Sequence, residues 1–180
     1  MKKHLATTIA TAVCLLAPLA HAQVIRPGLW EVSSNKMQVD GQQLPGMQEM
    51  LERMKSLPPE QRKMMEDMMA KQGVQVGDKG VRICLTAEQV KADNIPLQHQ
   101  QGGCKNEFTE RSAERWAFRF TCPEASGEGE TRFISDREYV TRITGTHQRS
   151  GQEAQQSEME YVSRWIGEDC GNVPPVRLQP

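Results

Sequence analysis

The sequence has few histidines and no recognisable catalytic motif. It contains four histidines in 180 residues, and only His99 and His147 lie outside the N-terminal segment. It has no glycine-rich phosphate loop and no Gly-x-Ser-x-Gly nucleophile elbow. Two pairs of glutamates, Glu128 with Glu130 and Glu158 with Glu160, alternate along the chain with residues of the inferred core face. This pattern is typical of a solvated strand face rather than of an acid–base pair. We therefore expect a non-catalytic protein with no cofactor, and an enzyme of unrecognised type is the alternative.

The chain also lacks an excess of basic residues. Its formal net charge is −1, and removal of Lys2 and Lys3 with the N-terminal segment leaves −3. Aromatic residues make up 5% of the chain, and no basic run interleaves with them. Nucleic-acid binding needs such basic patches, so the sequence does not indicate that function.

A single apolar run, from about Leu5 to Leu19, is too short for a membrane span. Two lysines precede this run, and Ala20-His21-Ala22 follows it as an A-x-A cleavage site. We expect residues 1–22 to be a signal peptide that is cleaved after Ala22, which places the mature protein in the periplasm. The residues before Cys14 do not match a lipoprotein signal, which needs a leucine three positions before the cysteine.

Four cysteines remain after cleavage, and an even number in an exported chain predicts two disulfides with three possible connectivities. A zinc site is not expected, because these cysteines should be oxidised. They are Cys84, Cys104, Cys122 and Cys170.

The residues between Cys104 and Cys122 alternate between polar and apolar with period two, which predicts a β-hairpin. The even positions share one face, so we expect Phe108 to pair with Phe118. This register places Cys104 opposite Cys122 and leaves Cys84 to pair with Cys170. The alternative joins Cys84 to Cys104 and Cys122 to Cys170.

Residues 42–72 form an insertion of different character, with two predicted amphipathic helices. Apolar residues recur at helical spacing from Met47 to Leu57. The second helix begins near Pro59, because proline is tolerated in the first turn, and ends at Gly73.

Three interpretations of this insertion remain open. In the first, the helices pack on the sheet or on each other as ordinary core, because a helix stripe is more often core than a cofactor site. Clustered thioethers also suit an adaptable apolar surface or a Cu(I) site. The candidate apolar binding surface consists of the methionines Met47, Met50, Met54, Met64, Met65, Met68 and Met69.

Further strands are predicted at 26–39, at 81–85 and along the alternating residues between Thr131 and Trp165. Trp30 is expected in the core, and Thr86 with Gln89 forms a capping box for a short helix. The pattern indicates an α+β fold: an antiparallel, meander-like sheet of about six or seven strands, shaped as a half-barrel or open barrel, with an inserted Met-rich helix pair. We expect a single domain over 23–170 and an extended tail over 171–180.

Several short segments in a fixed order resemble the domain-of-unknown-function family 3617, whose members are exported proteins of Gram-negative envelopes. These segments are Pro27-Gly28-Leu29-Trp30-Glu31, Leu57-Pro58-Pro59-Glu60-Gln61, Ile83-Cys84-Leu85-Thr86, the Cys104 and Cys122 pair, and Gly167-Glu168-Asp169-Cys170. The resemblance implies export and a β-rich domain. It implies no activity and no catalytic residues.

These observations lead to a functional hypothesis. We expect a periplasmic binding or envelope-maintenance protein whose partner is an apolar small molecule or a protein segment. A Met-based Cu(I)-binding protein is the alternative from the metal class. No feature of the sequence indicates an oligomeric state.

Overall fold

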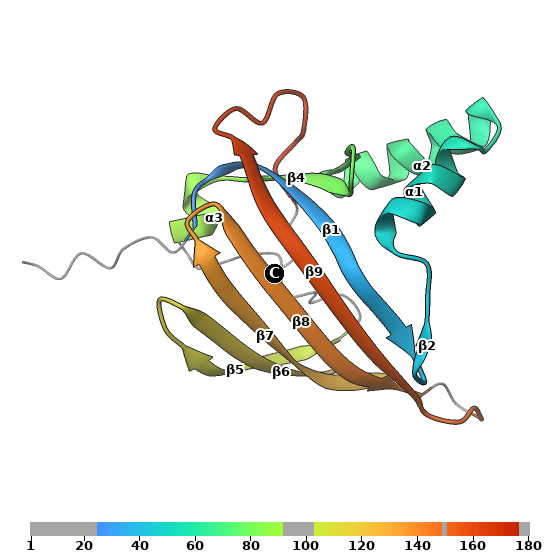
Figure 1. Cartoon of the computed structure of the whole chain (residues 1–180), viewed down its shortest axis with the longest axis vertical. Helices are drawn as coiled ribbons and strands as arrows, with labels where there is room; N and C mark the ends of the chain where they lie inside the picture. Colours follow the sequence, from blue (N-terminus) through green and yellow to red (C-terminus); the bar gives the residue numbers. More distant parts are fainter. Residues whose placement is uncertain (1–24, 92–102, 149–150, 177–180) are drawn as a thin grey trace, which may run out of the picture.

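The computed structural model describes residues 25–91, 103–148 and 151–176 (Figure 1). The described elements, in chain order, are β1 (Gly28–Val39), β2 (Gln42–Gln43), α1 (Met47–Lys55), α2 (Pro59–Lys71), β3 (Val74–Val76), β4 (Val81–Leu85), α3 (Ala87–Lys91), β5 (Lys105–Arg111), β6 (Arg115–Thr121), β7 (Ala125–Ser135), β8 (Glu138–His147) and β9 (Gln155–Gly167).

These elements form an α+β fold around one open antiparallel sheet. The strand order is β3-β4-β1-β9-β8-β7-β6-β5, and β2 pairs with the end of β1. Strands β5 to β9 form the expected meander, and the sheet curves into a half-barrel (Figure 1). The sheet has nine strands in the described residues, more than expected, because β2 and β3 are too short to show an alternating pattern.

The first strand and the last strand lie side by side, although they are far apart in the sequence. β1 pairs with β9 over most of its length and with β4 on its other side. A β-bulge between Ser34 and Lys36 keeps apolar residues of both strands on the concave face.

The core lies on the concave face, toward one end of the half-barrel. Trp30 is fully buried, as predicted, and its ring centroid lies 5.1 Å from that of Tyr139. Its indole Nε1–H donates a hydrogen bond of 3.0 Å to the carbonyl of Arg26. The buried cluster consists of Ile25, Trp30, Ile83, Leu85, Val90, Trp116 and Tyr139.

The β5–β6 hairpin confirms the predicted register over its first half. Phe108 pairs with Phe118, and the Cys104–Cys122 disulfide joins Cα atoms that are 4.0 Å apart. The expectation that even positions pair throughout is wrong beyond Phe108. A bulge shifts the register there, so that Glu110 pairs with Ala117.

The second predicted disulfide, Cys84–Cys170, is also present and joins Cα atoms 5.6 Å apart. Residues 171–176, which follow it, lie against the sheet. Val173 is buried, and the N–H of Val176 donates to the carbonyl of Cys84. The disulfide therefore holds residues 171–176 against β4.

The predicted capping box begins α3. The N–H of Gln89 donates to Thr86 Oγ1 over 3.1 Å, and the N–H of Thr86 donates to Gln89 Oε1 over 2.9 Å. Gln89 also donates from Nε2 to the carbonyl of Val176 over 2.8 Å. The Gln89 side chain thus connects the start of α3 to Val176.

The helices α1 and α2 form a hairpin that projects away from the sheet (Figure 1). α1 lies near β1, and α2 lies near β3. α2 begins with Pro59 in its first turn, and Gly73 follows it with φ +79, the left-handed conformation that favours glycine after a helix.

Candidate functional site

The concave face carries a cleft with a volume of about 460 Å³, which we call the concave cleft. It crosses four neighbouring strands, β4, β1, β9 and β8, and the first residue of α1 completes its wall. Its lining residues are Val32, Met47, Val81, Ile83, Tyr139, Thr141, Ile143, Met159, Tyr161 and Ser163.

Strand pairing explains why these side chains share one face. Tyr139 pairs with Ser163, Thr141 with Tyr161, and Ile143 with Met159. Directly paired residues of an antiparallel sheet point to the same side. The three β8 residues and the three β9 residues therefore form the floor of the concave cleft.

The hydroxyl groups in the cleft bond to other protein groups. The Oγ1 atoms of Thr131 and Thr141 lie 2.9 Å apart, and both threonines are buried. The hydroxyl of Tyr161 donates to the Met159 sulfur over 3.0 Å.

Burial raises the pKa of Tyr139 to about 12, against a smaller opposite effect of a side-chain hydrogen bond with Ser163. Burial also raises the pKa of Tyr161, so both phenols are neutral at physiological pH.

One wall of the cleft comes from the helical insertion. The backbone N–H of Met47 donates a 2.7 Å hydrogen bond to Ser34 Oγ on β1. The residue at the helix N-cap, Gly46, makes no side-chain cap. The Ser34 hydroxyl therefore satisfies an amide at the start of α1 and holds Met47 beside the cleft.

The seven predicted methionines do not form one surface. Met47 lines the concave cleft, and Met54 is 6% exposed, so it is not available at a surface. Met64 and Met68 are 68% and 65% exposed.

The other three also differ among themselves: Met50 and Met65 are exposed, and Met69 is half-buried. The interpretation of α2 as a helix packed through its methionines is wrong, because no residue of α2 is buried. The hairpin projects from the sheet instead of covering its concave face (Figure 1).

Most lining residues of the cleft were not singled out as site residues by the sequence. The alternation of Tyr139, Thr141 and Ile143, and of Met159, Tyr161 and Ser163, was visible and predicted strands. Alternation shows which side chains share a face of the sheet. It does not show whether other side chains cover that face or leave a cleft on it, because the cleft depends on how far the sheet curves.

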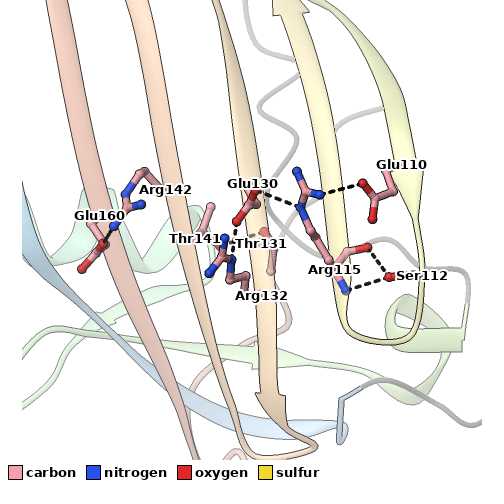
Figure 2. A network of polar contacts seen from close by, with 9 residues as sticks. All are labelled: Glu110, Ser112, Arg115, Glu130, Thr131, Arg132, Thr141, Arg142 and Glu160. Carbon is pink, nitrogen blue, oxygen red and sulfur yellow. Dashed lines mark hydrogen bonds and ion pairs between the residues drawn. The ribbon is translucent and has the colours of Figure 1, made fainter.

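The opposite face of the sheet carries charged side chains that pair across the strands (Figure 2). Arg142 pairs with Glu160, and Glu130 contacts both Arg115 and Arg132. Desolvation raises the pKa of Glu130, but the hydrogen bonds and charges of Arg132 and Arg115 together lower it below the usual value. These carboxylates lie in ion pairs, as structural charges on a solvated face do.

The described residues contain no group of three or more His, Cys, Asp or Glu side chains that could hold a metal ion. Their four cysteines are all in disulfides and supply no thiolate. The Cu(I) hypothesis stays a prediction based on methionine alone. No helix in the described part of the chain is long and apolar enough to cross a membrane.

The fold and the cleft define a class of protein: an open, disulfide-linked antiparallel half-barrel with an apolar cleft on its concave face. The chain matches the family "Protein of unknown function (DUF3617)" over residues 25–170, and it belongs to that family. It is similar to a Pseudomonas putida protein described as "Uncharacterized protein in lpd-3 5'region", with 52% identity over 134 residues, which is 74% of this chain and 94% of that protein. No solved structure matches the chain.

Proposed function

We propose that this protein is a non-catalytic periplasmic binding protein that holds an apolar ligand in the concave cleft. The observation that carries the proposal is the cleft itself, whose volume of about 460 Å³ lies within the range of about 300–1,000 Å³ for small-molecule sites. Its lining is mainly aliphatic and aromatic, with a few neutral hydroxyls. This composition is typical of a ligand pocket.

Two further features support a location in the periplasm. Disulfides persist in oxidising compartments such as the bacterial periplasm, and the chain has two. The N-terminal residues have the pattern of a cleavable signal peptide. An envelope protein of this kind would keep an apolar compound out of water.

A charge placed in the cleft tests the proposal. In Ile143→Glu, a carboxylate replaces an apolar side chain on the floor, and burying it without a partner is costly. We expect this variant to bind an environment-sensitive apolar dye at least about tenfold more weakly than the wild type, which corresponds to about 1.4 kcal/mol. The measurement is a fluorescence titration of the purified mature protein.

Ile134→Glu is the matched control, because Ile134 is 64% exposed on β7 and does not line the cleft. It should bind the dye as the wild type does. Equal loss of binding in both variants, or no dye binding by the wild type, would contradict the proposal. Circular dichroism of both variants establishes that they are folded.

The exposed methionines of α2 favour a second candidate function, the binding of an apolar protein segment. Methionine side chains adapt to varied apolar partners. Suppression of the aggregation of an unfolded client protein would test it. In that case Met64→Gln/Met65→Gln/Met68→Gln should lose the effect, and Ile143→Glu should keep it.

A further inference from the structure

We infer that the concave cleft takes an uncharged, extended hydrocarbon chain and leaves the polar headgroup of the ligand outside. This inference rests on the proposed function and adds the chemical class of the ligand. It follows from the charge, the hydrogen bonding and the shape of the cleft.

The first argument is charge. None of the described residues that line the cleft carries an ionised side chain at neutral pH. On β8 and β9, charged residues point to the opposite face of the sheet, where Arg142 pairs with Glu160 (Figure 2). An ionised ligand group in the cleft would lose its hydration without gaining an opposite charge.

The second argument is hydrogen bonding. Thr141 bonds Thr131, and Tyr161 bonds the Met159 sulfur. Specificity for a polar ligand comes from protein groups whose bonds the ligand completes. Because the hydroxyls of Thr141 and Tyr161 are already engaged with the protein, the ligand need bring no polar group to them.

The third argument is shape. The cleft crosses four adjacent strands, a width of roughly 14 Å at the spacing of neighbouring strands. A span of this length lets an extended hydrocarbon chain lie across the strands, in contact with residues of all four. Met47 at one wall has an unbranched, flexible side chain that can follow the contour of the chain.

A homologous series of alcohols tests the inference. Octan-1-ol, decan-1-ol and dodecan-1-ol should displace a bound apolar dye with affinities that rise about fourfold for each added methylene, which is the usual gain from burying that group. Affinity that does not change along the series would overturn the inference. The full mature protein is used throughout.

The headgroup is tested with decan-1-ol, decanoate and decyltrimethylammonium at neutral pH. We expect the alcohol to bind at least as tightly as either charged homologue. Tighter binding of the carboxylate or of the ammonium compound would show that a charged protein group reads the headgroup, and the inference would fail.

A paired substitution tests whether the ligand uses the cleft hydroxyls. Thr131→Val/Thr141→Val removes both partners of one hydrogen bond and keeps their shape, a change that proteins tolerate well. The variant should bind decan-1-ol at least as tightly as the wild type, because its cleft is more apolar. A loss greater than about fivefold would overturn the inference.

The two levels of the argument fail in different ways. If no alcohol and no dye binds, the proposed function fails. If a dye binds in the cleft and Ile143→Glu removes it, but the alcohols show no dependence on chain length, only the assignment of a hydrocarbon chain fails.

Discussion

Thr131 and Thr141 are polar residues at the centre of an apolar face. Both are almost completely buried, at 0% and 1% exposure, and each is the hydrogen-bond partner of the other. A buried hydroxyl that loses its partner pays its full desolvation cost, whereas removal of both hydroxyls is close to neutral. The pair therefore contributes stability only as a pair.

This leads to a prediction about single and double substitutions. Thr141→Val alone should lower the free energy of unfolding by about 1–3 kcal/mol, because it leaves the Thr131 hydroxyl unsatisfied. Adding Thr131→Val should recover most of that loss. Urea denaturation of the two single variants and the double variant measures the coupling, and additive effects would contradict the prediction.

Tyr139 predicts how stability depends on alkaline pH. In the unfolded chain a tyrosine ionises near pH 10, whereas burial raises the pKa of Tyr139 to about 12 in the fold. Above about pH 10 the unfolded chain loses a proton that the folded protein keeps, so the free energy of unfolding falls as the pH rises toward about 12. The contribution reaches at most about 2–3 kcal/mol.

The control for this effect is Tyr139→Phe, which has no ionisable hydroxyl. Denaturation curves over this pH range should have a shallower alkaline slope for the variant than for the wild type. Parallel curves would mean that Tyr139 ionises equally in both states. Below about pH 9 the two slopes should agree, because the phenol is then protonated whether or not the chain is folded.

At the scale of elements, the two helices of the insertion differ in how they are held. α1 buries Leu51 and Met54, and its first amide bonds Ser34 on β1. α2 buries no residue, and its exposed charges include the pairs Lys63 with Asp67 and Arg62 with Glu66. Exposed pairs of this kind contribute little stability. Because α2 buries no residue, its methionines have no role in the core.

Matched alanine substitutions along the hairpin test this difference. Met54→Ala should cost about 2–5 kcal/mol, because it empties a packed site. Met64→Ala and Met68→Ala should each change stability by no more than about 0.5 kcal/mol, since both side chains are mostly exposed. Thermal denaturation measures the three variants, and similar losses at all three positions would show that α2 is packed in solution.

At the scale of the whole molecule, the first and last strands of the chain lie side by side in the sheet. β1 pairs with β9, and the Cys84–Cys170 disulfide holds the following tail beside β4. The sheet nevertheless stays open between its edge strands β3 and β5, and a cleft remains on its concave face. The two disulfides stabilise this open fold without closing the cleft.

Export of the mature chain, without residues 1–22, is itself a prediction. The periplasmic fraction should contain a form that begins at Gln23, because Ala20-His21-Ala22 is a cleavage site. Intact-protein mass spectrometry should also show a mass reduced by four hydrogens, from two disulfides. Retention of residues 1–22 or recovery from the cytoplasm would contradict the proposed location.

Local features were predictable where a short stretch of sequence contained both partners. The capping box of Thr86 and Gln89 and the pairing of Phe108 with Phe118 follow from periods and spacings that neighbouring residues define. The bulge after Phe108 was missed, because alternation alone does not show an inserted residue.

The concave cleft was not predictable in the same way. Its lining combines Val32, Ile83 and Met159 from strands that are distant in the sequence. The methionines of α2 recur at helical spacing, but that spacing does not show whether another part of the protein packs against them. Burial of Met54 and exposure of Met64 depend on where the hairpin leaves the sheet.

The sequence by itself determined the longer strands, the helical insertion and the Cys104–Cys122 disulfide, because these depend on side-chain periodicity and on pairing within a short segment. It favoured Cys84–Cys170, whose partners are 86 positions apart, only as the remaining pair. Only the tertiary structure decided that β1 pairs with β9, that the hairpin projects from the sheet and that Met47 lines a cleft on the concave face. Those features depend on the curvature of the whole sheet and on contacts between residues more than a hundred positions apart, which no local pattern encodes.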